Sequence, residues 1–298
     1  MPPVVFVFLD GVGLDAPGEA NPLSSASMKA TARLLGGPLV AGAEQSHNGL
    51  LLAALDAQLG VEGIPQSATG QVSLFTGVNA AQRLGYHLPA YPNAPLQELV
   101  RERSVLRRAT DRGYQATFAN AYSPLYFAMI EKTNRRMSAT THAVLGAGIP
   151  FRWLSDLEKG CAVYWDMTNE HLAEQYDIDI PIIPARQAGT NLAHIARSND
   201  LVLYETFLTD RMGHKKRLDE AAAALERLDD FLDGLWSAVS PETTVVISSD
   251  HGNIEDLRRA VHTRNPVPLL VTGPGTAAFR SARSITDVAA GIMEVLDR

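Results

Sequence analysis

Residues 4–13 read VVFVFLDGVG: six apolar residues, an aspartate and a glycine-containing turn. An uninterrupted apolar run of this length is typical of a strand that is buried on both faces of a sheet. Asp10 then falls at the carboxyl end of that strand, where ligands collect in open α/β sheets. Gly11 and Gly13 would let the backbone approach such a ligand closely. An aspartate before glycine is also a common turn residue, so Asp10 alone does not establish a binding site.

Four further runs are apolar, rich in β-forming residues and bounded by turn or helix signals, at residues 115–120, 201–207, 243–248 and 267–273. Amphipathic helices are predicted between and after them, most clearly at 218–235 and 285–296, where apolar residues recur at three- and four-residue spacing. Near-continuous apolar strands that alternate with helices predict an α/β fold. We expect a mostly parallel central sheet with helices on both faces.

The pattern changes between residues 123 and 185. This segment contains the polar stretch EKTNRRMSATTH, a short strand expected at 162–165 and the proline-containing run DIDIPIIPA. We interpret it as a small cap that is inserted over the main sheet. The chain would then comprise a core domain, residues 1–122 and 186–298, and a cap or lid, residues 123–185.

Composition excludes several classes of protein. The net charge of −7 disfavours a nucleic-acid surface, because phosphate backbones are bound by basic patches. A small phosphorylated substrate remains compatible, because bound cations would supply local positive charge. A single cysteine excludes an internal disulfide. No run reaches the roughly 18 apolar residues of a membrane span, and the first strand is too short for a signal sequence. We therefore expect a cytoplasmic protein with no membrane partner.

Five further side chains that commonly bind metals follow the later strands: Asp210 and His214 in TDRMGH, Asp250 and His251 in SSDHGN, and His262 in VHTRNP. With Asp10, the residues Asp210 and Asp250 would bring acidic groups from three strand ends to one edge of the sheet. Each histidine taken singly is more typical of a surface or structural residue, but the convergence favours a metal centre. Carboxylates and imidazoles without thiolates suit Mn²⁺ or Zn²⁺, with Mg²⁺ as a third option. Two such ions about 3.5–4 Å apart can hold the attacking and leaving oxygens of a displacement at phosphorus.

The segment IPQSATGQVSLFTG, residues 64–77, supplies a candidate nucleophile in Ser67. The residues from Ser67 onward predict the start of a helix. A hydroxyl at that position meets a phosphate where free N–H groups and the helix dipole favour negative charge. Coordination to a metal ion would make this hydroxyl a usable nucleophile. The alternative is that Ser67 only caps the helix.

Together these motifs resemble the alkaline phosphatase superfamily of metalloenzymes, and in particular its branch with cofactor-independent phosphoglycerate mutase and phosphopentomutase. The motifs FLDGVG, GIPQSATGQVSLFTG, DRMGH, SDHGN and HTRNPVP occur in the order of the family. The resemblance implies two metal sites, one formed by Asp210, His214 and His262 and the other by Asp10, Ser67, Asp250 and His251. It also implies that Ser67 attacks phosphorus and carries a covalent phosphoryl group.

The chain departs from the mutases in two respects. Their signature usually carries a histidine four residues after the nucleophile, where this chain has Gln71, and their cap domains are much longer. A mutase must hold its dephosphorylated intermediate while that intermediate reorients. A small lid would exclude water from it less completely than a long cap domain does. We therefore expect a phosphatase or phosphodiesterase that acts on a small phosphorylated metabolite. The alternatives are a phosphoglycerate or phosphosugar mutase and a non-catalytic metal-binding protein, whereas a sulfatase is disfavoured by the lack of its C/S-x-P-x-R motif.

A cluster of polar and basic side chains in the expected cap offers candidate substrate-binding groups: Lys132, Asn134, Arg135 and Arg136. Arginine can bind a phosphate or carboxylate through two parallel hydrogen bonds. The alternative is that the cluster is a solvated surface loop. The sequence does not indicate an oligomeric state.

Overall fold

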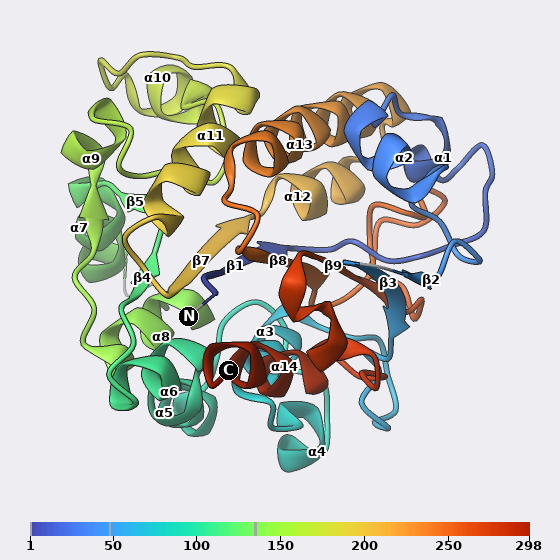
Figure 1. Cartoon of the computed structure of the whole chain (residues 1–298), viewed down its shortest axis with the longest axis horizontal. Coiled ribbons are helices and arrows are strands. Elements are labelled where there is room, and N and C mark those ends of the chain that lie inside the picture. The colour runs from blue at the N-terminus through green and yellow to red at the C-terminus, as the bar shows by residue number, and fades with distance from the viewer. Residues whose placement is uncertain (1, 48, 134–135) are drawn as a thin grey trace.

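A seven-stranded sheet divides the molecule into two helical layers (Figure 1). The computed structural model describes residues 2–47, 49–133 and 136–298. The strand order is β2-β3-β9-β8-β1-β7-β4. The strands are β1 (Val4–Leu9), β2 (Gln45–His47), β3 (Leu50–Leu55), β4 (Ala116–Phe118), β7 (Leu201–Thr206), β8 (Thr244–Ser249) and β9 (Val267–Thr272). All five strands that the sequence predicts are therefore present, and the α/β class is confirmed.

Strand β1 lies inside the sheet and pairs in parallel with β7 on one side and with β8 on the other. All six of its residues are buried, as the apolar run predicts. Its alternate side chains enter two separate cores, because successive residues of a strand point to opposite faces. Phe6 and Phe8 join one core, and Val5 and Val7 join the other.

One half of the sheet is parallel, and the other half is not. The strands β4, β7, β1 and β8 pair in parallel, whereas β9 pairs antiparallel with both β8 and β3, and β2 pairs antiparallel with β3. Pro268 lies opposite Ala54 of β3, and the pairing with β8 begins only at Leu269. This agrees with the exclusion of proline from central ladder positions. Strand β3 was not predicted, because its sequence LLLAAL consists of leucine and alanine, which favour helices when read locally.

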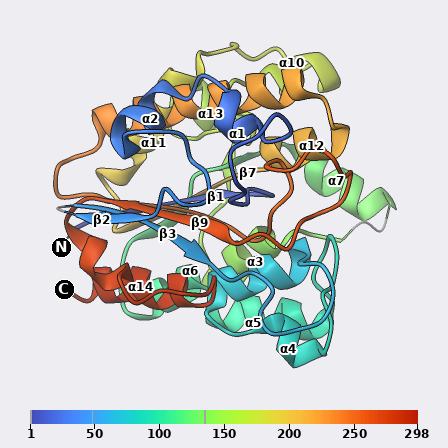
Figure 2. The same ribbon diagram turned by 90° about the vertical axis from the view of Figure 1, so that its right-hand side faces the viewer.

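Helices cover both faces of the sheet, which Figure 2 shows nearly edge-on. The layer against Val5 and Val7 contains α1 (Pro22–Ser25), α2 (Lys29–Leu35), α11 (Ala185–Ala196), α12 (Leu208–Lys215) and α13 (Leu218–Ala238). The opposite layer contains α3 (Ser67–Thr76), α4 (Ala80–Leu84), α5 (Ala94–Arg103), α6 (Val105–Asp111), α8 (Ala139–Ala147) and α14 (Asp287–Leu296). The predicted helices 218–235 and 285–296 correspond to α13 and α14.

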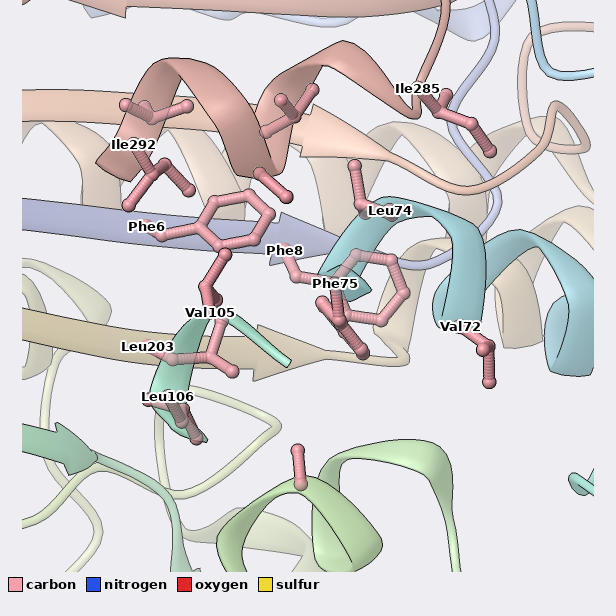
Figure 3. Packing of buried hydrophobic residues seen from close by; sticks show 14 of the residues in the cluster. Phe6, Phe8, Val72, Leu74, Phe75, Val105, Leu106, Leu203, Ile285 and Ile292 are labelled. Carbon is pink, nitrogen blue, oxygen red and sulfur yellow. The ribbon is translucent and has the colours of Figure 1, made fainter. Parts of the chain in front are cut away.

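Phe75 holds helix α3, which begins at Ser67, against the sheet. Its ring makes edge-to-face contacts with Phe8 and Phe6, at centroid distances of 5.2 and 6.2 Å. Figure 3 shows these rings together with Ile292 of α14 in the same core. A buried aromatic residue contributes much of the energy of such a core, so α3 is held firmly where it approaches β1.

The segment 123–185 forms α7 (Pro124–Thr133), α8, β6 (Arg152–Trp153), α9 (Leu154–Glu158) and α10 (Glu170–Tyr176). The strand β6 pairs with the two-residue strand β5 (Ala121–Tyr122), away from the main sheet. Helix α8 packs into the main core through Ala139, Ala143 and Val144. The strand expected at 162–165 is reduced to one bridge, between Val163 and Asn120. The division into a core and a separate cap stays a prediction.

The remaining regular element is the short 3-10 helix η1 (Pro274–Phe279), which precedes α14. Within residues 2–47, 49–133 and 136–298, none of the helices combines the length and the apolar character that crossing a membrane requires.

Candidate metal centre

Three neighbouring parallel strands deliver carboxylates to one edge of the sheet. Asp10 follows β1 and Asp250 follows β8, and the residues that precede them, Leu9 and Ser249, are partners in the register. Asp210 lies in α12, which begins shortly after β7. The convergence expected from the sequence is therefore present in the structure.

One group of candidate ligands is completely buried. Asp10, Asp250 and His251 each direct a donor atom to within 4.8 Å of the others. The Nε2 atom of His251 lies 3.3 Å from Oδ1 of Asp10 and 3.5 Å from Oδ2 of Asp250. The same Nε2 lies 3.1 Å from Oγ of Ser67. These four side chains are the set that the sequence resemblance assigns to one ion.

A second group adjoins the first. The carboxylate of Asp210 lies between two histidines. Its Oδ1 is 3.6 Å from Nε2 of His262, and its Oδ2 is 3.3 Å from Nε2 of His214. The donor atom of His251 lies within 4.8 Å of those of Asp210 and His262 as well. His251 therefore stands between the two groups, whereas the sequence resemblance assigns it to one site alone.

The three imidazoles are oriented by the backbone. Each ring nitrogen Nδ1 contacts a carbonyl oxygen: that of Ala260 for His214 at 3.2 Å, that of Gly252 for His251 at 3.4 Å and that of Pro65 for His262 at 3.0 Å. A carbonyl only accepts hydrogen bonds, so Nδ1 carries the proton and Nε2 keeps its lone pair. This is the arrangement that fixes histidine ligands around metal ions.

The buried carboxylates have the electrostatic character of a cation site. Oδ1 of Asp10 and Oδ2 of Asp250 have no hydrogen-bond partner among the described residues. Burial and the neighbouring carboxylates Asp250 and Asp210 raise the pKa of Asp10 well above its usual range, and burial and Asp210 do the same for Asp250. Buried, unpaired carboxylates are unfavourable unless a cation lies between them. The residues therefore fit divalent metal ions.

Ser67 is the first residue of α3, and Gln66 occupies the N-cap position without capping the helix through its side chain. The alternative role of Ser67 as a helix cap therefore does not apply. Its hydroxyl contacts His251 and faces the first ligand group. Gln71, one turn further along α3, places its amide Nε2 3.4 Å from Oδ2 of Asp10. Gln71, which stands where the mutase signature usually has a histidine, thus lies within the candidate metal centre.

Two buried residues that the sequence analysis did not select hold the ligand loops together. Glu255 accepts hydrogen bonds from the backbone N–H groups of Gly13 at 2.9 Å and of Asn253 at 2.7 Å. It also accepts from the side chains of Thr263 and Asn265. Asn253 in turn donates to Oδ1 of Asp210 at 2.6 Å. Asn253 is the last residue of the SDHGN motif and Glu255 lies two residues beyond it, and only this proximity could have indicated their roles.

A cavity of about 600 Å³ opens beside the metal-ligand groups. Ser67, Asp10 and Asp210 form its floor, together with His214 and His262. Part of its wall comes from segment 123–185, through residues of α7, α10 and the loop that contains Tyr164. The segment expected to act as a lid therefore contributes directly to this space.

The basic side chains proposed to bind substrate do not line the cavity. Lys132 and Arg136 are exposed and are not among its lining residues. Asn134 and Arg135 lie outside the described residues. A role for these four residues in substrate binding stays a prediction.

The fold and the site define the class of protein: an α/β metalloenzyme whose ligands gather at strand ends around a serine. The chain belongs to the Metalloenzyme superfamily, whose family model matches residues 2–297. Over 130 residues it is 35% identical to the 2,3-bisphosphoglycerate-independent phosphoglycerate mutase of Desulforudis audaxviator (strain MP104C). That match covers 41% of this chain and 25% of the mutase, so the chain spans about a quarter of that relative's length.

Solved structures show the same fold. The PH0037 protein from Pyrococcus horikoshii has a TM-score of 0.61 at 15% identity, covering 99% of this chain and 97% of that chain. A cold-active alkaline phosphatase from the psychrophile Shewanella sp. has a TM-score of 0.58 at 13% identity, covering 98% of this chain and 100% of that chain. Identities this low establish a shared fold alone, and membership of the superfamily rests on the family model that matches residues 2–297.

Proposed function

We propose that this chain is a metal-dependent phosphatase or phosphodiesterase that acts on a small phosphorylated metabolite through a phosphoserine at Ser67. The observation that carries this proposal is the position of the Ser67 hydroxyl, which lies 3.1 Å from Nε2 of His251 and at the start of a helix. Among the described residues, no other serine hydroxyl is hydrogen-bonded to the side chain of His251, which belongs to both candidate ligand groups.

Two divalent cations fit the donor set. Asp10, Ser67, Asp250 and His251 would hold one ion, and Asp210, His214 and His262 would hold the other. Oxygen and imidazole donors suit Mn²⁺ or Zn²⁺, and Mg²⁺ is the third candidate. When bound, such ions lower the pKa of a coordinated hydroxyl and neutralise the charge of phosphate oxygens.

The residues of the chain account for the steps at phosphorus. Ser67 loses its hydroxyl proton to solvent and its Oγ forms a bond to phosphorus. The bond from phosphorus to the ester oxygen breaks, and the alcohol leaves with a proton from solvent. The free N–H groups at the start of α3 face the phosphate oxygens and stabilise their charge. Water then attacks the phosphoserine, which releases inorganic phosphate and restores the Ser67 hydroxyl.

The mutase alternative is favoured by one observation, the name of the relative that is 35% identical over 130 residues. In a mutase the phosphoryl group returns from the serine to a second hydroxyl of the same substrate. Gln71 in place of the expected histidine, and the small lid, favour transfer to water instead. The two reactions differ in the ratio of free phosphate to isomerised ester, which can be measured with one phosphoglycerate sample.

Replacement of the nucleophile tests the proposal. The variant Ser67→Ala should lose phosphate release from a panel of phosphate esters, by at least about a thousandfold, while it still binds close to two metal equivalents. The matched control Ser198→Ala removes an exposed hydroxyl before β7, at the opposite edge of the sheet, and should retain full activity. Unchanged turnover in Ser67→Ala, with metal bound, would overturn the covalent mechanism.

A further inference from the structure

Aromatic side chains form two walls of the cavity next to the metal centre. Tyr122 and Tyr126 form one wall, with their rings edge-to-face at a centroid distance of 5.1 Å. Tyr164, Trp165 and Phe207 form the other, with Trp165 lying 5.7 Å from Tyr164 and 6.3 Å from Phe207. The cavity therefore offers mainly ring surface beyond its polar floor.

The hydroxyl groups of the first wall are already occupied. Both Tyr122 and Tyr126 are hydrogen-bonded to Oγ1 of Thr141, at 3.0 and 2.9 Å. These tyrosines consequently present their ring faces and edges to a ligand, and their hydroxyls are not required for it. On the second wall, the guanidinium of Arg211 covers the Trp165 ring at 4.9 Å from its centroid. This contact holds the Trp165 ring in place.

The same walls lack a partner for a second anionic group. Among the described residues, the side chains that line the cavity include the carboxylates Asp10, Glu205 and Asp210 and no lysine or arginine. A carboxylate or a second phosphate on the organic part of a substrate would lose its hydration there without gaining a cationic partner. A substrate such as a phosphoglycerate carries a group of this kind.

One acidic side chain of the cavity lining has no cationic partner among the described residues. Glu205 is buried, its Oε1 accepts a hydrogen bond from Thr140 at 2.9 Å, and its Oε2 has no partner among the described residues. Burial raises the pKa of Glu205 to about 8. Its carboxyl group is then mostly protonated at neutral pH and does not require a cation in the cavity wall.

We infer that the organic part of the substrate is an uncharged group that contains a planar ring and lies between these two aromatic walls. This inference rests on the proposed function, because it places the phosphate at the metal centre and the ring in the adjoining cavity. Stacking and edge-to-face contacts with the walls would provide the affinity. Because no lysine or arginine is among the described lining residues, carboxylated or doubly phosphorylated esters would be disfavoured.

Non-hydrolysable phosphonates test the inference by binding alone. Isothermal titration of the metal-loaded full chain compares benzylphosphonate with ethylphosphonate and with para-carboxybenzylphosphonate. We expect benzylphosphonate to bind at least about tenfold more tightly than either of the others. Equal affinities, no binding of any phosphonate, or tighter binding of the carboxylated ring would overturn the inference.

Variants on both walls locate the bound ring. Trp165→Leu should weaken benzylphosphonate binding by about tenfold and leave ethylphosphonate binding nearly unchanged. Trp153→Leu is the matched control, because Trp153 is an exposed ring of the same segment that does not line the cavity. Tyr126→Leu on the opposite wall serves as the second variant if Trp165→Leu loses metal or its folded signal. Loss of affinity for both phosphonates alike would contradict a ring-specific role.

Turnover separates this inference from the proposed function. Benzyl phosphate and ethyl phosphate have leaving alcohols of similar acidity, so their relative kcat/KM values report the contribution of the ring. Preferential binding of benzylphosphonate without hydrolysis of either ester would sustain the ring site and overturn the phosphatase proposal. Hydrolysis of both esters at equal kcat/KM, with equal phosphonate affinities, would overturn the ring site and sustain the phosphatase proposal.

Discussion

The imidazole of His251 stacks on that of His262, with ring centroids 3.7 Å apart and ring planes 13° apart. The two residues lie near opposite ends of the one connection that joins β8 to β9. Burial and the nearby His262 lower the pKa of His251 well below its usual value, and burial also lowers the pKa of His262. Both rings are therefore neutral near pH 7. Each Nε2 lone pair is then free to bind a metal ion without competition from a proton.

Metal removal should destabilise the protein. Bound cations would pair the carboxylates of Asp10 and Asp250, and a ligand present at a hundredfold excess over its Kd stabilises the folded state by about 2.7 kcal/mol. We expect a chelator to lower the Tm by about 5 °C or more, and added Mn²⁺ or Zn²⁺ to restore it. Differential scanning fluorimetry measures both changes. The double variant D10N/D250N is the control, and it should show no response to metal. A Tm in the native protein that is indifferent to demonstrated metal removal would contradict the assigned site.

Glu255 should be required for metal affinity although it is not a proposed ligand. Its carboxylate joins the loop after β1, through Gly13, to the connection between β8 and β9 that carries His251 and His262. Residues that orient ligands in this way typically change metal affinity by about 10–100-fold when they are replaced. We expect Glu255→Ala to weaken metal binding by that factor in a competition titration with a fluorescent chelator. Glu294→Ala, on the exposed face of α14, should bind metal as the native protein does.

Gly11 combines a left-handed backbone with a close approach to Asp210. Its φ is 70°, and an added Cβ would lie 2.6 Å from Oδ1 of Asp210. Gly36 is a matched control, because its φ is 77° and no atom lies within 4 Å of an added Cβ. We expect Gly36→Ala to lower the free energy of unfolding by about 1 kcal/mol and to keep its metal. Gly11→Ala should lose more stability and also bind metal weakly, as urea unfolding and metal analysis would show. Similar behaviour of the two variants would argue against the close approach.

Glu205 should make stability depend on pH. Burial raises its pKa to about 8, whereas an unperturbed glutamate titrates near about 4.3. Between these values the folded protein binds more protons than the unfolded chain, so stability falls as pH rises. We expect native protein to lose about 2 kcal/mol relative to Glu205→Gln between pH 6 and pH 8. Urea unfolding of metal-saturated samples at both pH values measures this difference.

The control for that measurement is Glu242→Gln, which changes an exposed carboxylate before β8. Its stability should follow that of the native protein across the same pH range. A pH dependence that is identical in the native protein and in Glu205→Gln would show that Glu205 is ionised in the folded state.

Much of the parallel half of the sheet was predictable because its strands are locally distinctive. The run of β1 and the run of β7 contain β-branched and aromatic residues and are bounded by turn or helix signals. The run LLLAAL of β3 is equally apolar but lacks such residues, so its extended conformation depends on pairing with β9. Strand β3 and its antiparallel pairing with β9 therefore could not be predicted from local pattern.

Only part of the candidate site could likewise be predicted from the sequence. The ligand types and the position of Ser67 at a helix start follow from short motifs whose residues are neighbours in the chain. The contacts of Glu255 with Gly13, of His262 with Pro65 and of Asn253 with Asp210 join residues that are far apart in the chain. A contact between distant residues leaves no periodic signature in the sequence. These supporting residues therefore emerged only from the folded structure.

By itself, the sequence determined the α/β class, the strand ends that carry carboxylates and the helix that begins at Ser67, because strand and helix periodicity and glycine turns act over a few residues. The tertiary structure decided that His251 lies between both ligand groups and that aromatic rings, with no described lysine or arginine, surround the adjoining cavity. These features depend on which segments pack together. That packing results from burying two hydrophobic cores on opposite faces of one sheet.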